Sequence, residues 1–242
     1  MPKIDIIIPV YNQTVKLIKC LKSIQKQTFQ DFLITIVDDG STDGVLSTLE
    51  SWLRSENLRA KDVKNEISTK TRVIHQNHLG AAAARNRGAK DTQCEYILFC
   101  DADVILNINF LETCLGTLTK NQQYSYCYTS FKYGIKKFKL WKFDEEKLKQ
   151  MPYIHTTSLL RRSDFTGFDE NMKRFQDWDL WLTMMENGKR GVWIPQYLFK
   201  VRSRGTMSKW IPKFMYVYFK NVKRVDDYNK AMEIIKIKHH IA

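Results

Sequence analysis

Short apolar runs alternate along the chain with segments whose apolar residues recur at helical spacing. Residues 4–10 and 32–37 are rich in β-branched residues and nearly continuous in their apolar character, as central strands of a parallel sheet are. The segment between them carries apolar residues three and four positions apart and predicts a helix ending near residue 27: Leu17, Ile18, Leu21 and Ile24. This alternation predicts an α/β fold.

The same alternation continues through the rest of the chain. Residues 55–70 interrupt it, because they are mostly polar and predict a loose excursion. The remaining elements are expected as helices over 45–54, 80–89 and from Asp177 onward, and as strands over 73–75, 96–100 and 124–129.

Two carboxylates follow the apolar strand predicted over residues 96–100. Asp101 and Asp103 are two positions apart, so in an extended chain they point the same way. Uncompensated acids beside an apolar strand are costly unless a cation lies there. A hard divalent cation that also holds a diphosphate, Mg²⁺ or Mn²⁺, fits this pattern. The alternative is a solvated acidic turn.

A second acidic loop follows the strand at residues 32–37. Residues 38–44 contain three aspartates and two glycines, beginning with Asp38 and Asp39. Open α/β sheets bind ligands at the carboxyl ends of their strands, and carboxylates there suit a ribose hydroxyl or the N–H groups of a base. A plain Gly/Asp turn is the alternative.

The helix expected over residues 80–89 begins with small residues that allow close packing on the sheet. Its two arginines, Arg85 and Arg87, lie about 200° apart around the helix axis, so at most one faces the crevice. A fixed guanidinium in the crevice would suit a diphosphate. The alternative is a surface helix with solvated arginines.

Composition narrows the class of partner. The 242 residues are 43% hydrophobic and 27% charged, which is ordinary for a globular protein, but the net charge of +13 is not. Such a charge indicates a polyanionic partner, which could be nucleic acid, anionic lipid or a phosphorylated substrate. The five cysteines show no metal-binding spacing, and we expect reduced, buried thiols. No stretch is apolar enough to span a membrane and no signal-peptide pattern is seen, so a cytoplasmic location is expected.

Four motifs in order carry a resemblance to a known family. They are Ile-Ile-Pro-Val-Tyr-Asn at 7–12, Val-Asp-Asp-Gly-Ser-Thr-Asp at 37–43, Gly80 with Ala-Arg-Asn-x-Gly at 84–88, and Asp-Ala-Asp at 101–103. The chain resembles family 2 glycosyltransferases of GT-A fold. The similarity continues through residues 158–162, 167–170 and 176–181, and so covers about residues 4–208.

The resemblance implies roles for individual residues. Four residues from the first two loops would hold the nucleoside: Pro9, Tyr11, Asp38 and Asp39. Asn77 would lie near the base. Arg85 would lie near the diphosphate, Asp101 would face the ribose or the metal, and Asp103 would bind the divalent metal. Asp177 would be the general base that deprotonates an acceptor hydroxyl, and the anomeric configuration would invert.

Two departures from the family pattern affect these roles. The glutamate that usually precedes the base is Gln176 here, which removes a charge and should leave the base less perturbed. A histidine that often follows in the family is replaced by Arg202 or Arg204. An arginine cannot ligate a metal but can clamp phosphate directly.

Other parts of the acceptor half and the tail allow two interpretations each. Residues 131–149 carry seven lysines against three acids, for which we favour a solvated face over a flank for an anionic acceptor. Trp178 is expected in the core, with an acceptor-sugar platform as the alternative, and His155 is expected to be structural. Residues 209–242 are basic and aromatic, and they fit either a helix packed on the domain or a segment lying on the inner face of an anionic membrane.

The sequence therefore predicts one GT-A-like domain with a nucleotide half (1–103), an acceptor half (104–208) and a basic helical tail (209–242). The expected reaction is an inverting, metal-dependent transfer of a sugar from a nucleotide donor, expected to be a UDP-sugar, to a glycan or lipid-linked acceptor in bacterial surface polysaccharide assembly.

Two rivals fit less well. A nucleotidyltransferase should show a glycine-rich triphosphate loop after the first strand, where this chain has Pro-Val-Tyr-Asn. A nucleic-acid-binding module should show a recognised binding motif and would not place acids at two strand ends, so no nucleic acid partner is expected.

Overall fold

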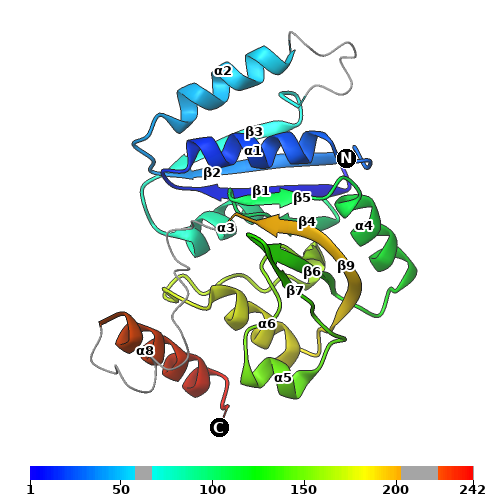
Figure 1. Cartoon of the computed structure of the whole chain (residues 1–242), viewed down its shortest axis with the longest axis vertical. Coiled ribbons are helices and arrows are strands. Elements are labelled where there is room, and N and C mark those ends of the chain that lie inside the picture. Colours follow the sequence, from blue (N-terminus) through cyan, green and yellow to red (C-terminus); the bar gives the residue numbers. More distant parts are fainter. Residues whose placement is uncertain (58–66, 203–222, 242) are drawn as a thin grey trace.

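The computed structural model describes residues 1–57, 67–202 and 223–241 and forms a mixed α/β fold (Figure 1). The strands are β1 (Ile4–Val10), β2 (Phe32–Asp39), β3 (Thr71–Gln76), β4 (Tyr96–Phe99), β5 (Val104–Leu106), β6 (Tyr126–Tyr133), β7 (Lys136–Phe138), β8 (Leu159–Arg161) and β9 (Gly191–Val201). The helices are α1 (Thr14–Gln25), α2 (Val45–Asn57), α3 (Ala81–Lys90), α4 (Phe110–Lys120), α5 (Glu145–Gln150), α6 (Gln176–Glu186) and α8 (Lys223–Lys238), with a 3-10 turn at Arg162–Asp164.

These strands form one sheet of nine in the order β3-β2-β1-β4-β8-β6-β9-β5, with β7 paired to β6. The first four in that order are parallel, and β8 joins β4 in the antiparallel sense. The sheet curls, because β5 follows β4 in the chain but lies at the far end beside β9. α1 and α2 cover one side of β1–β3, and α5, α6 and α8 lie on the other side of the molecule (Figure 1).

The predicted elements of the nucleotide half are confirmed with shifted ends. β1 and β2 are buried along almost their whole length, as expected of central parallel strands. α3 packs tightly on them: a Cβ added at Gly88 would lie 2.5 Å from the Ile7 Cγ2 atom, so the helix needs glycine there. Arg85 on this helix is buried and Arg87 is exposed, which confirms that only one of the two faces inward.

The prediction of an extended chain through both acids after β4 is wrong. The strand ends at Phe99, and residues 101–103 form a turn closed by the Val104 N–H donating to the Asp101 carbonyl at 3.0 Å. The turn is needed because β5 pairs with β9 rather than extending β4. It still keeps the two carboxylates together, and the charge of Asp101 acts on Asp103.

Two aromatic residues of α6 anchor the acceptor half. Trp178 and Trp181 are fully buried, and their Nε1 atoms donate to the carbonyls of Leu148 at 2.6 Å and Ile154 at 3.0 Å. Buried tryptophans usually find such a partner for the ring N–H. Trp178 is therefore a core residue, and the alternative role as a platform for the acceptor sugar is wrong.

The described part of the C-terminal tail, α8, packs on the domain beside α6. Its Ile235 is buried, and Tyr228 makes an edge contact with the Phe175 ring at 5.1 Å. The predicted boundary at residue 208 and the aromatic run of residues 210–219 lie outside the described residues. Among the helices that are described, none combines the length and apolar character needed to cross a bilayer.

Candidate active site

The loops after β1 and β2 meet at the carboxyl edge of the sheet and are tied to each other. The Asn12 N–H donates to Ser41 Oγ at 3.0 Å, and the Thr42 N–H donates to Asn12 Oδ1 at 2.8 Å. Asp43 accepts from the Thr14 N–H at 3.0 Å and so caps α1 from a different segment. Hydrogen bonds therefore hold the loops after β1 and β2 together at the sheet edge where the sequence predicts a ligand.

Asp38 and Asp39 are both buried at the end of β2, where they organise the next loop. Asp38 accepts from the Ser41 N–H at 3.0 Å and contacts His75 Nδ1 at 2.9 Å. Asp39 meets donors from four residues at 2.7–2.9 Å: Gln76, His78, Leu79 and Gly80. A carboxylate has about four acceptor positions, so Asp39 is saturated within the protein. A direct contact with a nucleoside stays a prediction for both aspartates.

An aromatic pair stands at this edge. The rings of Tyr11 and His78 stack with centroids 3.9 Å apart and planes 20° apart. Both are partly exposed, and Asn77, beside His78, is exposed as well. Pro9, which pairs with Val37 in the sheet, precedes this surface. Of the residues predicted to hold a nucleoside, Tyr11 and Asn77 are therefore open to a ligand.

Arg85 joins the two halves of the chain. Its side chain reaches from α3 to Asp101 Oδ1 at 2.7 Å and to Gln176 Oε1 at 3.0 Å, while the residue itself is 6% exposed. Burial alone would raise the pKa of Asp101, but the guanidinium charge lowers it below its usual value. Gln176, which stands where the family pattern has glutamate, accepts a hydrogen bond from Arg85.

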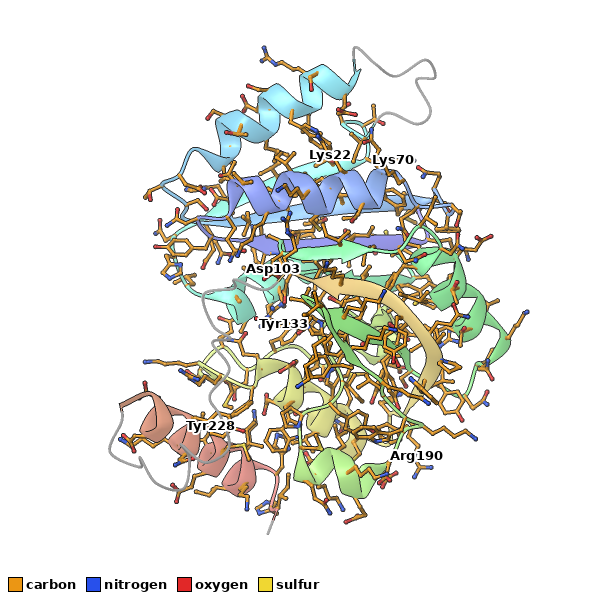
Figure 2. All side chains as sticks on the ribbon, in the orientation of Figure 1. Lys22, Lys70, Asp103, Tyr133, Arg190 and Tyr228 are labelled. Carbon is orange, nitrogen blue, oxygen red and sulfur yellow. The ribbon has the colours of Figure 1, made fainter. Side chains whose placement is uncertain are left out.

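In the part of the chain that the structure describes, Asp103 has no arginine paired with it in this way. Burial and the neighbouring Asp101 charge raise the pKa of Asp103 to about 6, with Lys16 acting in the opposite direction. Figure 2 shows Asp103 near the centre of the molecule, on the turn between the two halves. Among the described residues, this carboxylate therefore has no ion-pair partner to balance its charge at neutral pH.

The donor set at this turn fits a divalent cation that arrives with a diphosphate. Within the described ranges, no group of three or more His, Cys, Asp or Glu could hold a metal ion by itself. Mg²⁺ is commonly held by one or two carboxylates together with substrate phosphates. Asp101 and Asp103 supply that number of carboxylates, and burial together with the Asp101 charge raises the pKa of Asp103.

Asp177 lies in the first turn of α6, two residues after a residue in an uncommon backbone conformation. Phe175, the residue before the helix, adopts a left-handed conformation with φ 58°, which is uncommon for a bulky residue. Asp177 Oδ1 accepts from the Trp178 N–H at 3.0 Å. Burial raises the pKa of Asp177, although His155 and Arg85 oppose the shift. A raised pKa makes the carboxylate a stronger base.

His155, which the sequence predicts to be structural, lies close to the candidate site. Its Nδ1 accepts from the Thr157 N–H at 3.0 Å, so in the neutral ring Nε2 carries the proton. Burial lowers the pKa of His155, while the charges of Asp101 and Asp177 act to raise it. The neutral ring therefore lies close to both carboxylates. No local pattern predicts this position, because Asp101 and Asp177 come from segments distant from His155 in the sequence.

Of the two arginines predicted to lie near the phosphate, the structure describes only Arg202. The Arg202 N–H donates to the Asp103 carbonyl at 3.1 Å, which places Arg202 directly beside the acidic turn with an exposed side chain. Arg204 lies outside the described residues. Only Arg202 can therefore be placed at the candidate site.

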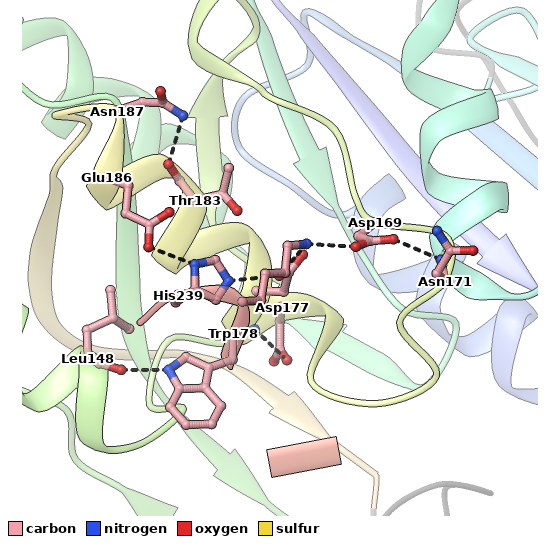
Figure 3. A network of polar contacts seen from close by, with 11 residues as sticks. Leu148, Asp169, Asn171, Asp177, Trp178, Thr183, Glu186, Asn187 and His239 are labelled. Carbon is pink, nitrogen blue, oxygen red and sulfur yellow. Dashed lines mark hydrogen bonds and ion pairs between the residues drawn. The ribbon is translucent and has the colours of Figure 1, made fainter. Parts of the chain in front are cut away.

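The C-terminal end of α8 and the residue after it contact α6 through a network of charged side chains (Figure 3). His239 Nδ1 lies 2.8 Å from Glu186 Oε1, and His239 Nε2 lies 2.9 Å from Asp179 Oδ1. Lys238 Nζ adds contacts to Asp169 at 2.7 Å and Asp179 at 2.8 Å. Because both ring nitrogens face carboxylates, His239 is held as the doubly protonated imidazolium. Asp179 is therefore structural, on a different face of α6 from Asp177.

Comparison with known proteins decides the family. The model for glycosyl transferase family 2 matches residues 5–176, most of the chain. The chain belongs to glycosyl transferase family 2. The family prediction made from the motifs is confirmed, and neither the nucleotidyltransferase nor the nucleic-acid-binding module is supported.

Relatives in this family come from several bacteria. Over 111 residues the chain is 36% identical to glycosyltransferase GlyG of Streptococcus pneumoniae, an alignment covering 46% of this chain and 33% of GlyG. It is 25% identical over 213 residues to the putative glycosyltransferase EpsE of Bacillus subtilis, covering 83% of this chain and 73% of EpsE. The alignment with chondroitin synthase of Escherichia coli is 27% identical and covers 78% of this chain and 27% of that protein.

Solved structures confirm the GT-A fold. The chain is similar to S. aureus TarS 1–349 in complex with UDP-GlcNAc, with a TM-score of 0.71 and 18% identity over 97% of this chain and 66% of that chain. It is also similar to the mannosyltransferase PcManGT of Pyrobaculum calidifontis, solved with GDP-Man and Mn²⁺, with a TM-score of 0.66 and 14% identity over 99% of this chain and 70% of that chain. The chain thus spans about a third of GlyG and roughly two thirds of the TarS fragment.

The two acidic residues of the turn should respond oppositely to neutralisation. The folded pKa of Asp103 lies above its unfolded value, so ionised Asp103 destabilises the fold above about pH 6. Asp103→Asn should therefore melt at or above the wild-type temperature at about pH 7.5, and the difference should vanish toward pH 4. Asp101→Asn is the matched control and should melt lower, because ionised Asp101 is stabilised by Arg85. Equal destabilisation by both variants would contradict this electrostatic account.

The imidazolium of His239 predicts a pH-dependent contribution to stability. Burial acts to lower the pKa of His239, but its bonds to Asp179 and Glu186 outweigh burial and raise it. The contribution is then complete below the unfolded pKa of about 6.5 and is lost as the pH rises through the higher folded pKa. His239→Gln should lower the free energy of unfolding by about 2–3 kcal/mol near pH 6 and by less near pH 9.

Denaturant titrations at the two pH values measure this, with His240→Asn as the control. His240 is exposed and left-handed, with φ 51°, a conformation that asparagine tolerates. A His239→Gln loss that is equal at both pH values would show a neutral ring.

Proposed function

We propose that this protein transfers a sugar from a UDP-sugar to a hydroxyl of a glycan or lipid-linked acceptor, with inversion and with a divalent metal. The observation that carries the proposal is the bridge made by Arg85. It joins the acidic turn at Asp101 to the start of α6 at Gln176 through two hydrogen bonds. The donor diphosphate would then lie on one side of the anomeric carbon, and the base Asp177 would lie on the opposite side, next to the acceptor hydroxyl.

The donor side is supported by the loops at the sheet edge. Tyr11, whose ring stacks on His78, and Asn77 are exposed there to receive a base, and the buried Asp38 and Asp39 hold the loops beside them in place. TarS, similar in fold, is solved with UDP and with UDP-GlcNAc, which favours uridine as the nucleoside.

Charge at the leaving group would be balanced by this chain's own cations and by the metal. A metal bound at Asp103 and Asp101 would neutralise the diphosphate as it leaves. Arg85 and Arg202 are the described arginines beside the turn. The Nε–H of Arg85 is buried and has no partner among the described residues.

The chemical step conserves atoms and charge. The acceptor oxygen forms a bond to the anomeric carbon while the bond from that carbon to the diphosphate oxygen breaks, and its electron pair leaves with the diphosphate. The acceptor proton passes to the carboxylate of Asp177. Because burial raises the pKa of Asp177, this carboxylate accepts a proton more readily than a solvated aspartate does.

We infer the setting of the reaction from relatives rather than from the site. EpsE and chondroitin synthase are bacterial proteins, and the second is named for making a polysaccharide. We therefore propose a role in bacterial surface polysaccharide assembly, in the cytoplasm and against the inner face of the membrane.

Asp177→Asn tests the mechanism. We expect transfer to slow by at least about a hundredfold, because the general base is lost while the shape is kept. The melting temperature should not fall, since the carboxylate is buried at a cost. Release of UDP from a panel of UDP-sugars, with and without Mn²⁺, gives the rate, and a thermal-shift titration with UDP gives binding.

The matched control is Asp179→Asn, two residues along the same helix. Asp179 holds His239 and Lys238, so this variant should melt lower and yet lose less rate than Asp177→Asn. Ordinary turnover by Asp177→Asn, or a rate loss explained by unfolding, would contradict the role of Asp177.

A further inference from the structure

Three lysines form a row across three neighbouring strands. Lys137 of β7 pairs with Lys132 of β6, and Lys132 pairs with Lys200 of β9. Paired residues of adjacent strands project from the same face of a sheet. With strands about 4.8 Å apart, this lysine row is a line of like charges about 10 Å long.

The neighbouring row shows which face the lysines occupy. Phe138, Phe131 and Phe199 pair one position away, and their rings stack with centroids 5.0 and 5.1 Å apart. The ring of His155 packs against two of them, Phe131 and Phe199. Because successive residues of a strand alternate between faces, the lysine row lies on the opposite face, and all three lysines are exposed.

The charges of the row are not balanced within the described protein. No carboxylate there lies within ion-pair distance of Lys132, Lys137 or Lys200, and the same holds for the nearby Lys139 and Lys142. Like charges directly opposite each other in a sheet are destabilising. The sequence alone favours a solvated face for residues 131–149, but the register shows a concentrated line of charge, which an anionic partner would offset.

An apolar residue stands fully exposed at the end of this hairpin. Ile135, in the turn between β6 and β7, is 100% exposed. It follows Gly134, whose φ of 59° forms the tight turn. A fully exposed isoleucine gains from contact with an apolar phase and gains nothing from a soluble polyanion.

The hairpin turn lies at the same end of the sheet as the acidic turn of the site. Tyr133 pairs with Val201, and Val201 pairs with Val104, the residue after Asp103. The Gly134 N–H donates to the Val201 carbonyl at 3.0 Å. The turn is therefore two strands, about 10 Å, from the start of β5, and Figure 2 shows Tyr133 close to Asp103 in the view.

We propose that the β6–β7 hairpin docks on an anionic lipid membrane, with Ile135 inserted among the lipids and the lysine row against the headgroup phosphates. Basic residues beside an exposed apolar side chain are the chemistry of interfacial binding. Docking there would hold the candidate site near the lipid surface, where a lipid-linked acceptor lies. The docking rests on charge, register and exposure and does not depend on the role of Asp177.

Flotation of the full chain with lipid vesicles tests the proposal. The vesicles are phosphatidylcholine alone or phosphatidylcholine mixed with phosphatidylglycerol, and only the mixture should bind. A triple variant, Lys132→Gln, Lys137→Gln and Lys200→Gln, should lose about fivefold in vesicle partitioning per lysine, or about a hundredfold in total. Ile135→Ser should lose about tenfold.

The matched control removes three lysines from α1 and its end: Lys19→Gln, Lys22→Gln and Lys26→Gln. These side chains are exposed, and Figure 2 shows Lys22 on α1, away from Tyr133. The control should bind vesicles nearly as wild type does, and the row variant should melt at or above wild type because like charges are removed.

Several outcomes would overturn the docking surface. Equal vesicle binding by the row variant and the α1 control would show that net charge or another segment binds the lipid. Equal binding to vesicles without phosphatidylglycerol would exclude an electrostatic surface. Loss of binding to a soluble acidic polysaccharide, with vesicle binding kept, would make the row a site for an anionic acceptor instead. UDP release by the row variant in detergent solution should stay near wild type, which separates this test from that of Asp177.

Discussion

The buried guanidinium of Arg85 is the contact on which the site depends. It comes from a helix of the nucleotide half, binds the acidic turn at Asp101 and reaches the first residue of α6 at Gln176. A buried charge is tolerated only when it is paired and hydrogen-bonded, so the three segments are fixed together. The close approach of α3 to the sheet at Gly88 sets where Arg85 can reach.

The surroundings of three nearby carboxylates give them different properties. Asp101, paired with Arg85, has a lowered pKa and stays ionised. Asp103 has no paired arginine among the described residues, and burial and the Asp101 charge raise its pKa to about 6. Burial raises the pKa of Asp177, so its carboxylate is suited to accept a proton. Environments that shift similar groups apart in pKa commonly separate catalytic roles.

The sequence predicts the parts of this site that follow from local pattern. The acids that follow two apolar strands and a small-residue helix carrying one inward arginine are visible as runs and spacings, and the motifs name Asp177. The rest depends on contacts between distant segments. Nothing local shows that β5 crosses to β9, that His155 lies beside Asp101 and Asp177, or that Phe175 is left-handed. The contact between His239 and Asp179 joins residues 60 positions apart, and a periodic sequence pattern does not reveal such a contact.

The most direct test of one shared crevice is a crystal structure of the protein with UDP and Mn²⁺, in which anomalous scattering locates the metal. The account predicts Mn²⁺ bound by Asp103 and by the diphosphate, with the terminal phosphate directed into the space between Arg85 and Asp177. Manganese at another place, or a diphosphate that points away from the start of α6, would contradict it.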